Sequence, residues 1–162
     1  AMVDFKTFAT AIDTLFPNGV EMNAQFSTVD GEKVSEVEVP DDLLLVNVDG
    51  KLMVQVLINI LSNALKYTKE KDQITIQVKK IKDAIEFSIK DTGIGISKNI
   101  LEHIFDEFVT DANISNDSQK GIGLGLAICK AIIQAHGGEI EAKNDEQGAC
   151  FVFTIPNEEL SV

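Results

Sequence analysis

The segment from Lys51 to Thr68 is the feature that most restricts how this chain can fold. Its apolar residues recur at helical spacing and cover more than one face of the predicted helix, which indicates a helix that is substantially buried. Other layers of structure must therefore pack against it. The apolar positions are Leu52, Met53, Val56, Leu57, Ile60, Leu61, Ala64 and Leu65.

Alternating apolar residues elsewhere in the chain predict strands that come in pairs. A tight turn at Lys82-Asp83 joins one pair as a hairpin, and Pro156 ends the last strand. The predicted strands are 73–80, 84–90, 139–143 and 150–155, with two or three shorter ones between 20 and 48.

Three further helices are expected, at 3–15, near 98–105 and at 124–136, the last ended by Gly137-Gly138. The polar stretch 109–120 has almost nothing to bury and is predicted to be a loop or lid. Helices and strands in this order indicate an α+β two-layer sandwich, in which helices cover one face of a mixed, mainly antiparallel sheet.

The 162 residues and 44% hydrophobic content suit one compact domain, which we expect to span 3–162 as a monomer. We expect Ala1 and Met2 to be a remnant of cloning, with Val3 near a cut inside a larger protein. Cys129 and Cys150 are too few for a disulfide framework and lack the spacing of a zinc site, which fits a reducing cytoplasm.

The net charge of −12 argues against binding to nucleic acid or anionic lipid through overall charge, because both are polyanions. A phosphate ligand would have to be bound locally by backbone N–H groups, a metal ion or a few cations. No apolar run reaches the roughly 18 residues that span a bilayer.

Asn59, Asn63 and Lys66 form a polar stripe on the long apolar helix, within about 60° around its axis. Amide oxygens can bind a hard cation such as Mg²⁺, and a lysine one turn further on can pair with phosphate. The alternative is that the stripe simply faces water.

A second motif, Asp91-Thr-Gly-Ile-Gly95, directly follows a predicted strand. An aspartate there is costly to bury without a donor, and an adenine amino group would be such a donor. An ordinary Asp-Gly turn is the alternative. The triplet Asp91-Thr-Gly also occurs in aspartic proteases, whose catalytic site needs two such triplets. This chain has one, so a homodimer would be required, and those enzymes usually have Ser or Ala at the position of Ile94.

Glycines at 121, 123 and 125 lie between the polar lid and the start of an apolar helix, where backbone N–H groups and the helix dipole favour an anion. Tight helix packing is the alternative. Between this motif and the previous one, Phe105 and Phe108 are either core residues or a hinge that anchors the lid.

These four elements, in this order, resemble the N, G1, F and G2 boxes of histidine kinase catalytic domains, in the GHKL ATPase superfamily. The resemblance runs from about Asp49 to Pro156 and includes Asn59-Ile-Leu-Ser-Asn-Ala-Leu-Lys-Tyr-Thr68. It implies a Bergerat-type fold that binds ATP with Mg²⁺ and passes the γ-phosphate to a histidine on a separate dimerisation domain. It also implies two-component signalling to a response regulator, from a parent protein anchored in a membrane.

The resemblance further implies a role for each matching position. Asn63, assisted by Asn59, would hold Mg²⁺, and Lys66 would touch phosphate. The implied nucleotide contacts are Tyr67 beside the nucleotide, Asp91 on the adenine amino group, Gly93 and Gly95 in that pocket, and Gly121, Gly123 and Gly125 around the phosphates. Ile96, Phe105, Lys120, Leu124 and Leu126 complete the expected nucleotide site.

Two features depart from the family pattern. The predicted lid holds Asp111, Asp117 and a single cation, Lys120, where similar kinases often have more positive charge. The chain also lacks a phosphoacceptor, because neither His103 nor His136 is in a setting like that of the family, and structural roles are expected for both.

Three other functions stay open. Gyrase-type ATPases of the superfamily have a glutamate where this chain has Asn59, so the general base is missing. A serine-directed kinase is harder to exclude, and a degenerate interaction module without nucleotide would keep the fold. The segments 128–138 and 40–43 look similar to the potassium-responsive sensor kinases.

Overall fold

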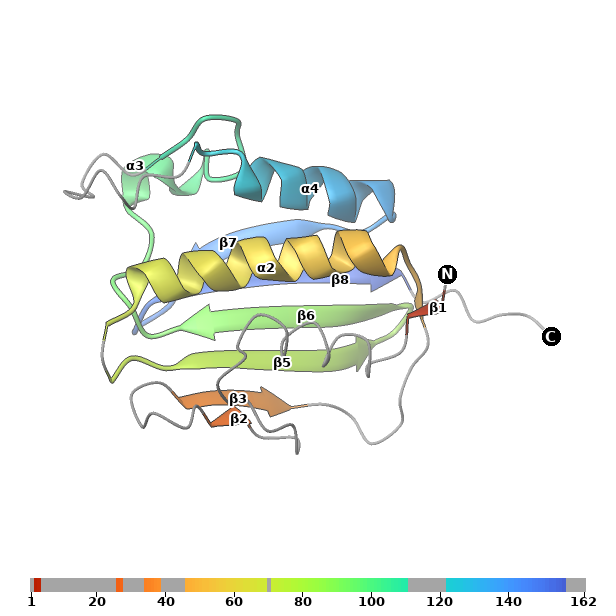
Figure 1. The fold of residues 1–162 in the computed structure, drawn as a ribbon, viewed down its shortest axis with the longest axis horizontal. Helices are drawn as coiled ribbons and strands as arrows, with labels where there is room; N and C mark the ends of the chain where they lie inside the picture. The colour runs from red at the N-terminus through yellow and green to blue at the C-terminus, as the bar shows by residue number, and fades with distance from the viewer. Residues whose placement is uncertain are drawn as a thin grey trace.

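The computed structural model of the chain describes residues 2–3, 26–27, 34–38, 46–69, 71–110 and 122–156. A sheet forms one layer and the two long helices form the other (Figure 1). The helices are α2 (Gly50–Tyr67), α3 (Lys98–Leu101) and α4 (Gly125–Ala135). The strands are β1 (Met2–Val3), β2 (Phe26–Ser27), β3 (Val34–Glu38), β4 (Val46–Asn47), β5 (Ile74–Ile81), β6 (Ala84–Asp91), β7 (Ile140–Asn144) and β8 (Ala149–Pro156).

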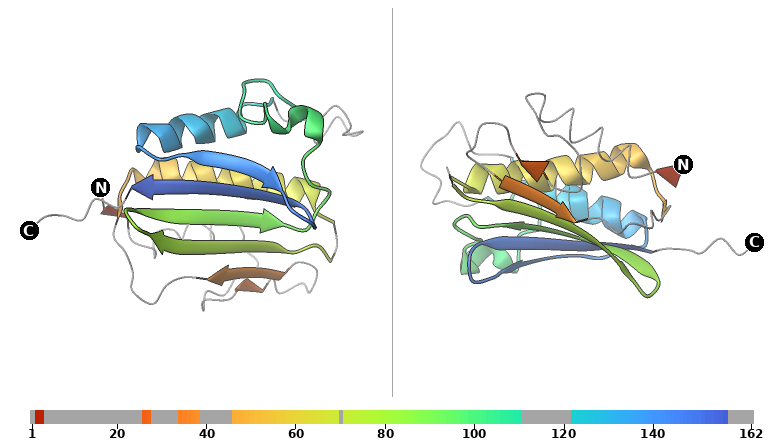
Figure 2. Two further views of the ribbon diagram at one scale, coloured as in Figure 1. Left: turned by 180° about the vertical axis from the view of Figure 1, so that it is seen from behind. Right: turned by 90° about the horizontal axis from the view of Figure 1, so that it is seen from below.

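The main sheet has the strand order β2-β3-β5-β6-β8-β7. Its neighbours pair antiparallel except β3 and β5, which pair parallel. The parallel pair follows from α2, which returns the chain across the sheet between β3 and β5. Seen from below, α2 and α4 lie on one side of the twisted sheet (Figure 2). The predicted mixed, mainly antiparallel sheet with helices on one face is confirmed.

Asp49 starts α2 as its N-cap, since its Oδ1 accepts hydrogen bonds from the backbone N–H groups of Lys51 at 2.9 Å and Leu52 at 3.2 Å. The helix packs against the sheet on one side and against α4 on another. Val56 and Ile60 are completely buried, as the apolar pattern of this segment predicts.

The core lies between the helices and the strands β5, β6 and β8. Alternate residues of β6 are buried, so Ile85, Phe87 and Ile89 all face the helices. Phe87 stacks on Phe153 of β8 with ring centroids 4.7 Å apart. The antiparallel register of β6 and β8 places these two phenylalanines directly opposite each other.

The structure departs from the predicted elements at three places. Val3 lies in β1 instead of beginning a helix, and the rest of that predicted helix lies outside the described residues. The short helix ends at Leu101, because the chain then turns through i→i+3 bonds such as His103 N–H to Ile100 O at 2.9 Å. Pro156 is the last residue of β8, whereas the prediction ended the strand before it. Proline has no backbone N–H to donate to a neighbouring strand, and the end of a strand tolerates this loss.

Within the described ranges, no helix combines the length and the apolar character that crossing a bilayer requires. The predicted lid lies outside the described residues from 111 to 120.

Candidate functional site

A cavity of about 330 Å³ opens between α2, the end of β6 and the start of α4. It brings together residues from three of the four predicted motifs, which are up to 67 positions apart. The predicted site residues that line it are Asn59, Asn63, Lys66, Tyr67, Asp91, Gly95, Ile96, Gly123, Leu124, Gly125 and Leu126. Lys120 and Gly121 lie outside the described residues.

Asp91 provides the buried carboxylate of the cavity, with only 3% of its surface exposed. Its Oδ1 accepts hydrogen bonds from the backbone N–H groups of Gly93 at 2.9 Å and Ala149 at 3.4 Å. No described residue donates a hydrogen bond to Oδ2, so this oxygen can accept one from a bound molecule. Burial raises the pKa of the Asp91 carboxyl above its usual value of 3.8, and the two backbone donors only partly oppose this.

Gly93 and Gly148 allow two backbone segments to approach Asp91 and the end of α2. A Cβ on Gly93 would be 2.4 Å from the carbonyl oxygen of Tyr67, and a Cβ on Gly148 would be 2.1 Å from that of Asp91. Both distances are too short for a side chain. Gly93 is not among the residues that line the cavity, and it shapes the site by packing beneath it.

The polar stripe of α2 faces the cavity. Asn59 Nδ2 donates to the backbone carbonyl of Gly125 at 3.1 Å and so joins α2 to the first residue of α4. Its Oδ1 remains for a cation, as does the amide oxygen of Asn63, which is half-buried one turn further along. Lys66 Nζ lies 5.3 Å from the centre of the Tyr67 ring.

Among the described residues, no three or more His, Cys, Asp or Glu side chains are grouped so that they could hold a metal ion. A cation in this cavity would therefore be bound by amide oxygens together with oxygens of the ligand. That set of hard ligands suits Mg²⁺, which usually takes few protein ligands when it is bound with phosphate.

Gly123 brings the two ends of the predicted lid together. Its φ of 75° is in the left-handed region, and a Cβ there would be 2.7 Å from the backbone of Phe108 and Val109. The N–H of Phe108 donates to the carbonyl of Gly123 at 2.9 Å. No side chain caps the start of α4, whose first N–H groups lie at the cavity and favour an anion.

Phe105 does not line the cavity. It packs edge-on against Phe151, which does, with ring centroids 6.4 Å apart. Phe108 is 66% exposed, so only one of the two phenylalanines packs against the core.

The apolar lining of the cavity includes six residues that were not among the predicted site residues: Ile100, Ile104, Val109, Ile122, Ala149 and Phe151. Their apolar character in the sequence is that of ordinary core residues. Nothing in the sequence around each of them marks it as a cavity residue, because they line the cavity only when α3, the residues beside the predicted lid and β8 come together in the fold.

A family model described as "Histidine kinase-, DNA gyrase B-, and HSP90-like ATPase" matches residues 48–159. The chain belongs to this ATPase family. The match contains every motif that lines the cavity, from the polar stripe of α2 to the glycines before α4.

Two curated proteins to which the chain is similar are named as sensor kinases. The chain is 49% identical over 124 residues to Sensor protein KdpD of Clostridium acetobutylicum, a match that covers 76% of this chain and 14% of that protein. It is 43% identical over 124 residues to Sensor histidine kinase WalK of Bacillus subtilis, covering 75% of this chain and 20% of that one. The chain thus corresponds to a small part of these relatives.

Solved structures of the same ATPase family share the fold. The catalytic domain of histidine kinase ThkA superposes with a TM-score of 0.77 at 27% identity, over 97% of this chain and 96% of that one. Full-length ShkA in complex with AMPPNP gives 0.70 at 28% identity, over 96% of this chain and 30% of that one. The structure of ThkA in complex with response regulator protein TrrA has a TM-score of 0.69 at 25% identity, and the match covers 99% of this chain and 43% of that one.

Proposed function

We propose that this chain is the ATP-binding catalytic domain of a sensor histidine kinase, which binds Mg-ATP and donates the γ-phosphate to a histidine on a separate dimerisation domain. The observation that carries this proposal is the cavity itself. It is lined by a buried carboxylate with one open oxygen, and by two amides, a lysine and a helix N-terminus. The carboxylate matches the adenine of a nucleotide, and the other groups match its phosphates.

At the adenine end, Asp91 Oδ2 accepts a hydrogen bond from the exocyclic amino group. Ile96, Ile104 and Phe151 form apolar walls that hold the flat base and exclude water. A guanine base would present an oxygen to the same carboxylate and be repelled, so the site selects adenine.

At the phosphate end, Lys66 and the first N–H groups of α4 neutralise negative charge. Asn63, assisted by Asn59, would hold Mg²⁺, and the ion would supply positive charge to offset that of the phosphates. Phosphoryl transfer needs mainly positioning and charge neutralisation, which these groups supply. Lys120 and Gly121 lie outside the described residues, and contacts of both with the phosphates remain part of the proposal.

Hydrolysis of ATP, as in gyrase-type members of the superfamily, is disfavoured because no described residue at the phosphates can act as a general base. Asp91 is the single carboxylate among the described residues that line it, and its place is at the adenine end. Asn59 is bonded to Gly125 and cannot act as a base toward water. The domain therefore keeps the phosphate for transfer to an acceptor.

The proposed partners are the dimerisation domain of the parent kinase and, through the full-length protein, a response regulator. The ThkA complex with response regulator protein TrrA supports the second of these. The parent is proposed to be membrane-anchored, with this domain on the cytoplasmic side and monomeric by itself. Nucleic acid is not a proposed partner, because the net charge is −12.

Titration with a fluorescent ATP analogue, with and without Mg²⁺, tests the proposed function. We expect saturable binding that tightens with Mg²⁺ and that ADP displaces far better than GDP. Absence of saturable binding would overturn the proposal and favour an interaction module without nucleotide.

A further inference from the structure

Asn144, the last residue of β7, is bonded through its side chain to the loop that follows β6. Its Oδ1 accepts a hydrogen bond from the N–H of Ile96 at 2.7 Å, and its Nδ2 donates to the carbonyl of Ile96 at 2.6 Å. One side-chain amide thus satisfies both backbone groups of a residue 48 positions earlier in the chain.

The neighbouring glycine makes room for this contact. Gly95 has a φ of 73°, and a Cβ added there would lie 3.0 Å from Asn144 Oδ1. Gly95 and Ile96 both line the cavity, whereas Asn144 does not. Asn144 can therefore act on the site only through the loop that it holds.

The same end of the β7–β8 hairpin also reaches the carboxylate of the site. Asn144 pairs in register with Ala149, whose N–H donates to Asp91 Oδ1. Asp145, the next residue, closes the turn by accepting hydrogen bonds from Gln147 N–H at 2.9 Å and Gly148 N–H at 3.1 Å. One hairpin end therefore contacts both sides of the adenine pocket, the Ile96 wall and Asp91.

We propose that Asn144 is a positioning residue for adenine, because its amide fixes the Gly95–Ile96 loop against the β7–β8 hairpin in the conformation that receives the base. This proposal rests on the proposed function for the identity of the ligand. Without the Asn144 side-chain amide, the Gly95–Ile96 loop would have to become ordered when the ligand binds. The entropy lost in this ordering lowers the affinity, although no contact with the ligand is removed.

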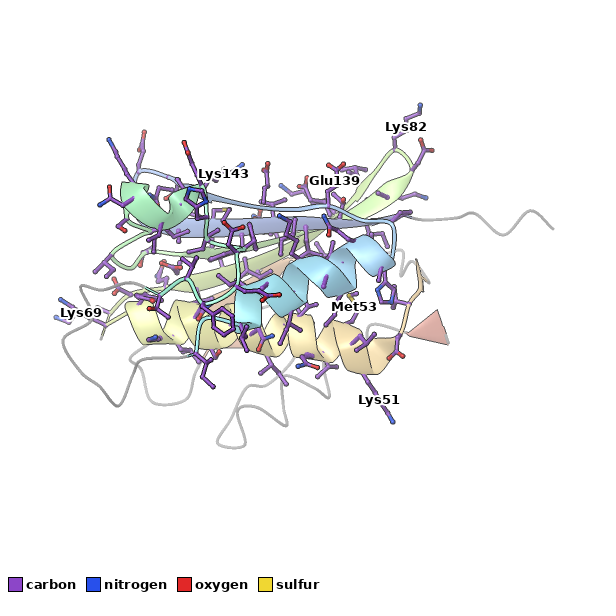
Figure 3. All side chains as sticks on the ribbon, turned by 90° about the horizontal axis from the view of Figure 1, so that it is seen from above. Lys51, Met53, Lys69, Lys82, Glu139 and Lys143 are labelled. Carbon is purple, nitrogen blue, oxygen red and sulfur yellow. The ribbon has the colours of Figure 1, made fainter. Side chains whose placement is uncertain are left out.

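Asn144→Ala tests the proposal, with Lys143→Ala as the matched control. Lys143 precedes Asn144 on β7, is exposed and points away from the helices (Figure 3). We expect Asn144→Ala to weaken ADP binding about tenfold by calorimetry. The ratio of ATP affinities with and without Mg²⁺ should stay that of wild type, because the phosphate end is untouched.

Amide hydrogen exchange at Ile96 separates positioning from a general loss of stability. We expect the Ile96 N–H to exchange at least about tenfold faster in Asn144→Ala, while the amides of β6 keep their wild-type protection. In Asn144→Asp the carboxylate still accepts from Ile96 N–H but repels the Ile96 carbonyl. In Asn144→Asp the Ile96 N–H should therefore stay protected from exchange while ADP binding weakens. This second variant keeps the test decisive if Asn144→Ala fails to fold.

Two results would overturn the proposal: ADP affinity of Asn144→Ala within twofold of wild type, or unchanged exchange at Ile96. A wild-type domain that binds no ADP would instead overturn the proposed function. In that case the exchange measurement would still decide whether Asn144 orders the loop.

Discussion

Asp91 is a carboxylate that the fold removes almost completely from water while leaving one oxygen open to the cavity. In Asp91→Asn the remaining oxygen can still accept from Gly93 and Ala149, which puts an NH₂ group at the place of Oδ2. That donor would face the donor of adenine, so we expect ADP affinity to fall at least about tenfold, measured by calorimetry. Unchanged affinity for ADP would contradict the adenine role of Asp91.

The same substitution has an opposite effect on the stability of the ligand-free domain. Burial raises the pKa of Asp91 above 3.8, so the folded state disfavours the charged form. The stability contribution of the carboxyl is therefore present below pH 3.8 and is lost as the pH rises through the folded pKa.

We expect Asp91→Asn to unfold at a higher temperature than wild type at neutral pH, since the variant has no charge to bury. The difference should shrink as the pH falls toward 3.8, where wild-type Asp91 is also protonated. Thermal unfolding of both proteins across this pH range measures it. A difference that grows toward acid pH would show that burial does not control this carboxyl.

Asn63 and Asn59 are chemically alike but differently held. Asn59 is bonded to Gly125, whereas the amide of Asn63 has no hydrogen bond to another described residue. We expect Asn63→Ala to abolish the enhancement of ATP binding by Mg²⁺ and to leave ADP binding without Mg²⁺ within about twofold of wild type. Gln55→Ala, exposed on the same helix and away from the cavity, is the control.

At the scale of elements, His136 joins the end of α4 to the start of α2. Its Nε2 accepts a hydrogen bond from the N–H of Asp49 at 3.1 Å, and its Nδ1 lies 2.7 Å from the carbonyl of Ile132. The histidine therefore acts as a bridge between the two helices, which fits the structural role expected from the sequence.

His136→Ala should lower the free energy of unfolding by about 1 kcal/mol, because it removes two hydrogen bonds, of which the one to Ile132 is partly buried. Urea unfolding measures this change, with Gln134→Ala, exposed on the same helix, as the control. Nucleotide affinity should not change, since His136 is remote from the cavity. An unfolding free energy equal to that of the control would exclude the bridging role.

At the scale of the molecule, the chain has two histidines, and neither lines the cavity. His103 is exposed and pairs with Asp106 at 2.9 Å, and His136 is engaged between the helices. Among the described residues, the cavity therefore has no histidine that could accept a phosphoryl group.

We expect no acid-labile phosphate on this chain after incubation with Mg-ATP. Adding the dimerisation domain of the parent kinase in trans should produce acid-labile phosphate on that domain. The Asp91→Asn variant should transfer at least about tenfold less at limiting ATP, which ties transfer to the adenine site. Phosphate on His103 or His136 would contradict the separation of donor and acceptor.

The sequence by itself determined the elements and the motifs that they present. Helical periodicity gives α2 and α4, and alternation gives the paired strands, because the pattern within each segment reports which face is buried. Asp49 marks the start of α2 for an equally local reason, since a cap bonds residues two and three positions away. Strand ends and the break at Leu101 were missed, because they depend on turns with weak local preferences.

Only the tertiary structure decided how the motifs become a site. Ile104 and Phe151 form one wall of the cavity, and Asn144 reaches Ile96, because the order β6-β8-β7 places these distant segments side by side. Such contacts depend on which strands are neighbours and on the register between them. The alternating pattern of a single strand is compatible with several neighbours and registers, so it does not predict these contacts. The sequence therefore names the groups that can bind a nucleotide, and the packing of the whole sheet against two helices sets the distances at which they act.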